Sequence, residues 1–385
     1  MKALRNFVDK IKPTFSEGGK LSALHSTFDA FETFLFVPNT VTKKGAHIRD
    51  CNDIKRVMIV MVVALLPALL FGMYNTGLQH ARALGLDWTV MQSFWFGFLK
   101  VLPVVIVSYV VGLAIEFASA QIRGHEVNEG FLVTGMLIPL VMPVGTPLWM
   151  VALGTAFSVI VCKELFGGTG MNVFNPALVA RAFVFFSYTA SISGDAVWYA
   201  DVDGYTGATA LGQLADTGST QFSMWDAFWG FIPGCIGETS TAAILIGAVI
   251  LIYTGIASWR IMLSVFAGGL AMGLLFNALA PAEPQTAMQM YMALPAWQHL
   301  LLGGFAFGAV FMATDPVTAA QTNTGKWIVG LMIGALAVLI RVVNPGYPEG
   351  MMLSILFMNA VAPLVDYYVV EANVRRRNKR LKLAK

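Results

Sequence analysis

Long apolar runs recur along almost the whole chain, and few folds can accommodate them. Ten segments have membrane-spanning character, at residues 57–73, 99–119, 130–143, 147–163, 176–191, 236–256, 261–279, 298–314, 326–341 and 351–370. Only 12% of the 385 residues are charged, about half of the fraction that is typical of soluble domains. The sequence therefore predicts an all-α polytopic membrane protein with about ten transmembrane helices.

The distribution of charge predicts how these helices cross the membrane. Seventeen of the 25 Lys and Arg residues lie in residues 1–56 and 366–385, whereas none lies between Arg181 and Arg260. Cytoplasmic segments collect Lys and Arg, so we expect both termini in the cytoplasm and the acidic 192–235 stretch in the periplasm. The expected organisation is a cytoplasmic segment (1–55), a first membrane repeat (56–191), the periplasmic loop (192–235), a second membrane repeat (236–370) and a basic cytoplasmic tail (371–385).

Two of the predicted spans are short for a 30 Å hydrocarbon core. The third and fifth spans both neighbour Gly- and Pro-rich sequence, which is typical of discontinuous helices that line a site near the midplane. Trp149 to Lys163 is also echoed 178 residues later by Trp327 to Arg341. We expect two inverted five-helix repeats with short or broken helices, although apolar helices can also resemble each other by chance.

Residue types that hold common redox cofactors are scarce. Cys51, Cys162 and Cys235 are far apart and form no C-x-x-C, so this chain alone is expected to hold neither an iron–sulfur cluster nor a redox dithiol. The basic tail directly follows a predicted span, where such residues more often lie near anionic lipid than bind nucleic acid. Near the N-terminus, Leu24, Phe28, Phe31 and Leu35 are spaced as one helix face, which indicates either an interfacial helix or a docking face.

The most informative stretch runs from Asp203 to Thr209 and reads D-G-Y-T-G-A-T. It matches D-x-x-[S/T]-G-A-T, the sequence at which a flavin transferase attaches FMN to threonine through the phosphate. The chemistry fits, because Thr209 supplies a hydroxyl nucleophile, Gly207 and Ala208 leave room for the second enzyme, and Asp203 can orient a metal or the hydroxyl. An ordinary polar turn is the alternative.

Several further blocks carry a family resemblance. They are 125–130 (HEVNEG), 167–170 (GGTG), 175–177 (NPA), 311–316 (FMATDP) and 344–350 (NPGYPEG). From Lys43 to Arg377 the chain resembles the family of membrane proteins that includes the B subunit of Na⁺-translocating NADH:quinone oxidoreductases and, more distantly, the D subunit of Rnf complexes. Thr206 stands where that family often has Ser.

The resemblance implies a set of cofactors and sites. It implies covalent FMN on Thr209 and non-covalent riboflavin near Asn172 and Asn175. It also implies a quinone site around Gly112 and Glu116. Finally, it implies that Asp315 and Asp366 lie on a Na⁺ path.

Each implied site has an alternative that the residues themselves allow. Asn172 or Asn175 could cap a helix. Glu116 could reach the interface while Gly112 packs against another helix. Asp366 could form a lipid-facing ion pair next to the basic tail.

The functional prediction is a membrane subunit that passes electrons through flavins to ubiquinone and couples this to Na⁺ export. No nucleotide-binding G-x-G-x-x-G unit follows a strand pattern, so NADH oxidation is expected on another subunit. The expected partners are other subunits of a multisubunit complex, a flavin transferase and membrane lipid, in a bacterial inner membrane and without nucleic acid. An Rnf-type subunit, or a flavin-free secondary transporter or channel, is the alternative.

Overall fold

The computed structural model describes residues 2–15, 28, 32, 36, 44–46, 54–123, 130–188, 202, 209–217, 219–344 and 350–383. Every regular element within these residues is a helix, which confirms the all-α class. The motif residues Asp203, Gly207 and Ala208 lie outside the described residues, and so do Leu24, Phe31 and Leu35. A helix that the sequence did not predict, α1 (Lys2–Phe15), lies near the N-terminus.

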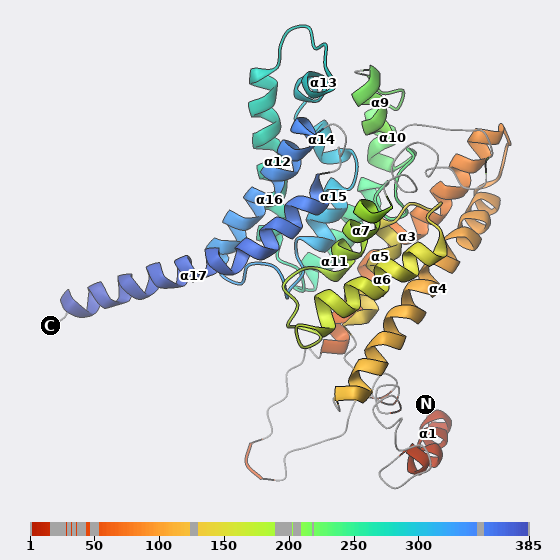
Figure 1. Cartoon of the computed structure of the whole chain (residues 1–385), viewed down its shortest axis with the longest axis vertical. Coiled ribbons are helices and arrows are strands. Elements are labelled where there is room, and N and C mark those ends of the chain that lie inside the picture. Colours follow the sequence, from red (N-terminus) through yellow and green to blue (C-terminus); the bar gives the residue numbers. More distant parts are fainter. Residues whose placement is uncertain are drawn as a thin grey trace.

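Five of the described helices are long and apolar enough to cross a membrane. They are α3 (Ile54–Leu84), α4 (Val90–Arg123), α12 (Trp259–Leu279), α16 (Asn323–Val343) and α17 (Met351–Leu383). Shorter apolar helices lie between them: α5 (Phe131–Val141), α6 (Leu148–Ser158) with the π-helical turn η2 (Val159–Glu164), α7 (Pro176–Ser187) and α11 (Thr241–Tyr253). The chain is a multipass bundle (Figure 1).

Each predicted span overlaps a helix, but several helices extend beyond the predicted span. The first two predicted spans lie within the longer helices α3 and α4, which are separated only by residues 85–89. His80 follows the predicted first span and lies in α3, where its ring stacks on Phe96 with centroids 4.1 Å apart. The basic tail continues α17 as a helix to Leu383. The third and fifth spans are short helices, as predicted, of 11 and 12 residues.

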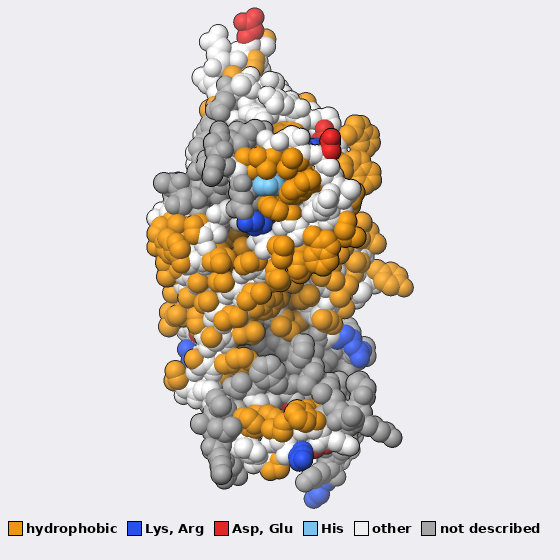
Figure 2. All heavy atoms as spheres, turned by 90° about the vertical axis from the view of Figure 1, so that its right-hand side faces the viewer, with side chains coloured by type: hydrophobic (Ala, Val, Ile, Leu, Met, Phe, Trp, Pro, Cys, Tyr) orange, Lys and Arg blue, Asp and Glu red, His pale blue; other side chains and the backbone are white. Residues whose placement is uncertain are grey.

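The outer face of the bundle is apolar. Side chains such as Leu99, Val110 and Leu274 expose 63%, 62% and 57% of their surface, and Figure 2 shows hydrophobic side chains forming a broad belt with few charged groups inside it. Exposed apolar area on this scale suits contact with lipid instead of water. The number of crossings and their orientation stay predictions.

Small residues bring the long helices close together. A Cβ atom added to Gly97 of α4 would lie 1.7 Å from the Met73 carbonyl oxygen of α3, and one added to Gly334 of α16 would lie 1.9 Å from the Val265 oxygen of α12. Backbones can approach this closely only where no side chain intervenes. The pairs α3–α4 and α12–α16 are therefore packed through glycine.

The predicted eighth span is broken into α14 (Gln298–Leu301), α15 (Phe305–Phe307) and the π-helical turn η4 (Gly308–Met312). Gly303, with φ of +65°, makes the turn at the break. The fully buried Arg341 guanidinium donates to the carbonyl oxygens of His299 and Leu302, at 2.6 and 2.9 Å. A cation is favourable at the C-terminal end of a helix, so Arg341 stabilises the break.

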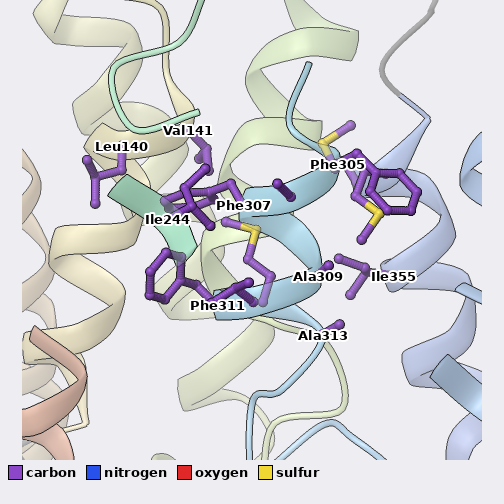
Figure 3. Packing of buried hydrophobic residues seen from close by; sticks show 14 of the residues in the cluster. Leu140, Val141, Ile244, Phe305, Phe307, Ala309, Phe311, Ala313 and Ile355 are labelled. Carbon is purple, nitrogen blue, oxygen red and sulfur yellow. The ribbon is translucent and has the colours of Figure 1, made fainter. Parts of the chain in front are cut away.

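The continuation of this broken helix forms the centre of the core. Figure 3 shows Phe307 and Phe311 on the side that faces Ile244, with Phe305 on the opposite side. Phe311 approaches α11, because a Cβ added to Gly247 would lie 2.6 Å from its Cζ atom. α5, α11 and α17 surround this core.

Further short helices gather at one end of the bundle. α9 (Ala210–Thr217), α10 (Met224–Trp229) and α13 (Ala287–Ala293) lie at the top of Figure 1, and α1 lies at the bottom. The Tyr291 hydroxyl of α13 donates to the Leu211 carbonyl of α9 at 2.6 Å. Asn277, near the end of α12, donates to the Met292 carbonyl of α13 at 2.8 Å. α9 therefore rests at the C-terminal end of α12.

Candidate functional site

A partly open cavity lies at the opposite end of the bundle, near the starts of α3, α5, α7 and α12. It contains about 730 Å³ of empty space, including the part open to solvent. Val57, Met61, Leu137 and Phe311 are among the apolar side chains that line it. Ligand pockets are mostly apolar, with a few polar groups that fix the orientation of the ligand.

Asn175 contributes one of those polar groups and also begins α7. Its Oδ1 accepts from the N–H groups of Ala177 and Leu178, at 3.0 and 3.4 Å, in the first turn of the helix. Its Nδ2 donates to Asp315 Oδ2 at 3.3 Å. The capping alternative is thus confirmed for Asn175, and the same amide connects α7 to a cavity carboxylate.

Asp315 lies in the loop between η4 and α16. Its carboxylate also accepts from the Val317 N–H and the Thr318 hydroxyl, both at 3.1 Å. The side chain is partly exposed by surface area because it borders the cavity, yet protein surrounds it. This burial raises the pKa of the Asp315 carboxyl, and the hydrogen bonds from Val317, Thr318 and Asn175 oppose the rise.

Asn172 reaches the cavity through a glycine-rich loop. Gly167 and Gly168 follow η2 with φ of +116° and +97°, which only glycine adopts readily. The loop then turns back so that Asn172 lines the cavity, while its Nδ2 donates to the Phe174 carbonyl at 3.1 Å. The Gly-Gly-Thr-Gly block therefore shapes the cavity wall.

A buried ion pair lies at the wall of the same cavity. Lys163 of η2 pairs with Glu116 of α4, and both side chains are only 4% exposed. Lys163 lines the cavity, and its Nζ lies 5.7 Å from the centroid of the Phe131 ring. The alternative that Glu116 reaches the interface is wrong, because the carboxylate is buried against Lys163.

Gly112 serves to accommodate the Phe131 ring. A Cβ atom at this position would lie 1.8 Å from Phe131 Cζ. A flat ring thus does approach the backbone of Gly112, and it is the Phe131 ring of the chain itself. The quinone role of Gly112 and Glu116 stays a prediction.

Asp366 does not line the cavity and instead caps a helix. Its carboxylate accepts from the N–H groups of Gln321 and Thr322, at 2.6 and 3.0 Å, and from the Thr322 hydroxyl. Thr322 is the N-cap of α16, where a negative charge is favourable. The alternative of a lipid-facing ion pair for Asp366 is therefore wrong, and its place on a Na⁺ path stays a prediction.

Thr209 lies at the end of the molecule opposite to the cavity. It is half-buried, and its hydroxyl accepts from the Gly212 N–H at 3.2 Å at the start of α9. α12 begins two residues after Ala257, which lines the cavity, and ends beside α13 and α9. Its 21 residues span about 30 Å, comparable to a hydrocarbon core.

The structure brings together Asn172, Asn175 and Asp315 at one cavity, and it places Thr209 and Asp366 elsewhere. The sequence argument missed Lys163 and Thr314 as lining residues. The signal for Lys163 was present, because an ionisable residue inside a predicted span is a functional candidate by default. Among the described residues, no group of three or more His, Cys, Asp or Glu side chains is arranged to hold a metal ion.

Comparisons with known proteins show which family the chain resembles. The model of the NQR2, RnfD, RnfE family matches residues 41–375. The chain is 49% identical to the B subunit of the Na(+)-translocating NADH-quinone reductase of Chromohalobacter salexigens, over 98% of this chain and 96% of the relative. The proteins of the same name from Stutzerimonas stutzeri and Neisseria meningitidis serogroup B are 48% and 47% identical, over 97% and 98% of this chain and 98% and 99% of the relatives.

Proposed function

The chain belongs to the NQR2, RnfD, RnfE family, and from this membership we propose that it is the membrane subunit of a sodium-pumping NADH:quinone oxidoreductase that carries two flavins. One flavin is FMN, esterified through its phosphate to Thr209. The other is riboflavin, held without a covalent bond in the cavity at Asn172 and Asn175. Electrons pass to ubiquinone, and the redox reaction drives Na⁺ export.

The cavity is the observation that carries this proposal. Most of the cavity wall is apolar and suits the dimethylbenzene edge of a flavin ring. The polar edge of such a ring carries alternating carbonyl and N–H groups. Asn172 and Asn175 amides, the Thr314 hydroxyl and the Lys163 ammonium are the groups that would hold it. When bound, the flavin supplies the one- and two-electron chemistry that these side chains lack.

The position of Thr209 supports a second, separate flavin. Its hydroxyl lies at the start of a short helix beyond the end of α12, where an enzyme in the opposite compartment could reach it. Its Oγ1 accepts one hydrogen bond and no side chain of the described residues donates to it. A phosphate ester at this position would lie at a helix N-terminus, where backbone N–H groups favour an anion.

The names of the relatives favour the NADH:quinone enzyme over the Rnf-type protein. The three relatives described above, which this chain covers almost completely, are each named as the B subunit of a Na(+)-translocating NADH-quinone reductase. A flavin-free transporter would share the short and broken helices but would have no use for the sequence that ends at Thr209.

The covalent flavin is tested on a denaturing gel viewed under ultraviolet light. The chain is produced in a host that contains the flavin transferase, as wild type, Thr209→Val and Thr217→Val. Thr217 ends the same helix and provides a matched hydroxyl. We expect fluorescent bands for the wild type and Thr217→Val and a dark band for Thr209→Val. A dark wild-type band would refute covalent attachment.

The non-covalent flavin is tested by acid extraction of the Thr209→Val chain. Asn175→Ser keeps a side-chain oxygen for the α7 cap and removes the amide that faces the cavity. We expect extractable flavin in the parent and at least about a tenfold weaker retention, or 1.4 kcal/mol, in Asn175→Ser. Equal flavin content in both chains would argue against this cavity as the riboflavin site.

A further inference from the structure

The ammonium of Lys163 is the positively charged group among the described residues that line the cavity. Among the described lining residues, Lys163 carries the positive charge and Asp315 the negative one. The carboxylate of Asp315 already accepts from Val317, Thr318 and Asn175. The Lys163 ammonium has three N–H groups, of which Glu116 Oε1 accepts one. Lys163 is thus the cation that can act on a ligand in the cavity.

The local helix geometry fixes where this charge lies. The π-helical turn η2 widens the end of α6, and the Leu165 N–H bonds to the Ile160 carbonyl at 3.0 Å. The turn directs the adjacent Lys163 and Glu164 toward α4, where Glu164 accepts from Ser119 and pairs with Arg123. π-Helical turns within α-helices are frequent at functional sites. The second one, η4, contributes Phe311 to the same cavity.

Glu116 lies behind Lys163 as seen from the cavity. It pairs with the ammonium but does not line the cavity. A ligand in the cavity therefore lies nearer to the positive end of the pair than to the negative end. Both side chains are buried, and charges interact more strongly in such an environment than in water.

We propose that Lys163 is a positioning residue that raises the reduction potential of the flavin in this cavity, and that Glu116 opposes it. The proposal rests on the proposed function. The step would be electron transfer only, with no bond formed or broken, and the electron would come from the FMN that the proposed function places on Thr209. The added negative charge is stabilised by the ammonium and disfavoured by the carboxylate, so the two partners of one ion pair act with opposite sign.

The two single variants should shift the reduction potential in opposite directions, and this distinguishes an electrostatic role from a purely structural one. Removal of either partner leaves an unpaired buried charge, which destabilises the protein. A structural role would therefore make both single variants lose flavin or shift its potential together. An electrostatic role predicts a lower potential in Lys163→Met and a higher one in Glu116→Gln. The double variant Glu116→Gln/Lys163→Met removes both charges and leaves neither unpaired.

The experiment is a spectroelectrochemical titration of the full chain in the Thr209→Val background, where the observed flavin is the non-covalent one. We expect the highest reduction potential in Glu116→Gln, followed by the parent with both native residues and then by the double variant. Lys163→Met should have the lowest potential. Lys163→Arg, which keeps the charge, should stay close to the parent. A tenfold change in the preference for the reduced ring corresponds to about 59 mV for a one-electron couple.

Two outcomes overturn different claims. A Thr209→Val chain that contains no flavin overturns the proposed riboflavin site, and the inference falls with it. A chain that retains flavin, but whose potential is unchanged in the double variant or moves the same way in both single variants, overturns the inference alone. Flavin content and thermal unfolding, measured on the same samples, identify a variant that has failed to fold. The double variant and Lys163→Arg then decide the result.

Discussion

Individual side chains in this protein often serve the fold and the candidate site together. Asn175 caps α7 with its oxygen and meets Asp315 with its nitrogen. Lys163 is half of a buried ion pair and also part of the cavity wall. Sequence reasoning treated capping and binding as competing explanations for the asparagines. The structure shows that the Asn175 oxygen makes the cap while the nitrogen of the same amide contacts Asp315 at the cavity.

The resemblance placed two aspartates on a Na⁺ path. Because their surroundings differ, we expect substitution of each one to have a different effect. Asp315→Asn alters a cavity carboxylate, so we expect the Na⁺ concentration for half-maximal quinone reduction by the complex to rise about tenfold, or 1.4 kcal/mol. Asp366→Asn removes charge from the start of α16, so we expect a loss of about 0.3–1 kcal/mol of stability and a smaller rise in the Na⁺ concentration for half-maximal turnover than Asp315→Asn causes. The measurements are Na⁺ titrations of turnover and thermal unfolding in detergent.

A reversed pattern would contradict this assignment. If Asp366→Asn changes the Na⁺ dependence strongly while Asp315→Asn does not, the ion path passes beside α16 and avoids the cavity.

Among the elements, helix class and approximate position could be predicted from the sequence, but helix ends and breaks could not. Apolar runs indicate where a helix must be buried in lipid or protein. They do not mark the 302–304 break, because its flanking residues are as apolar as the rest, and its stabilising Arg341 lies 39 residues beyond Leu302 in the chain. Such long-range partners leave no local signal.

The contacts in the two halves favour the predicted inverted repeat without deciding it. In the first half, Gly112 accommodates the ring of Phe131, whose helix starts near Lys163. In the second half, Gly269 accommodates the ring of Phe305 in the same way, with its added Cβ 2.5 Å from Cζ. Arg341, which the sequence aligned with Lys163, lies at the start of that helix. The repeat stays a prediction.

The contact between Gly112 and Phe131 gives a prediction at the level of helix packing. Gly112→Ala places a Cβ atom 1.8 Å from Phe131 Cζ, so either the Phe131 ring or the helices α4 and α5 must shift. We expect a loss of about 1–3 kcal/mol of stability, typical of an overpacked core, measured by thermal unfolding. The double variant Gly112→Ala/Phe131→Leu should recover much of it.

A different result would favour the quinone site. If Gly112→Ala unfolds at the wild-type temperature but weakens the apparent affinity for quinone, the glycine contacts the substrate and not only Phe131.

At the scale of the whole molecule, the two candidate flavin sites lie at opposite ends of the bundle. The charge distribution predicts that the 192–235 segment faces the periplasm and that the cavity faces the cytoplasm. Figure 1 shows α9, which begins beside Thr209, at one end of the bundle and the start of α3, which borders the cavity, near the other end. These sides are predicted from the sequence because the distribution of Lys and Arg is a property of the whole chain. The sequence could not predict the cavity, whose walls come from distant segments.

Cysteine labelling tests this orientation. Ser219→Cys and Met171→Cys place exposed thiols near α9 and near the cavity mouth, respectively. Cys51 is replaced by Ser, and the buried Cys162 and Cys235 are kept. A membrane-impermeant maleimide should label position 219 in intact cells and position 171 only after the membrane is opened. Labelling of position 171 from outside would reverse the topology.

The central claim is that this chain is a flavin-carrying redox subunit, and mass spectrometry of the Thr209 region tests it most directly. Trypsin should leave residues 182–260 as one fragment, because the first basic residue after Arg181 is Arg260. We predict that this fragment from cells with the flavin transferase carries one FMN through a phosphate ester, lost in Thr209→Val. An unmodified wild-type fragment, or FMN retained in Thr209→Val, would contradict the account.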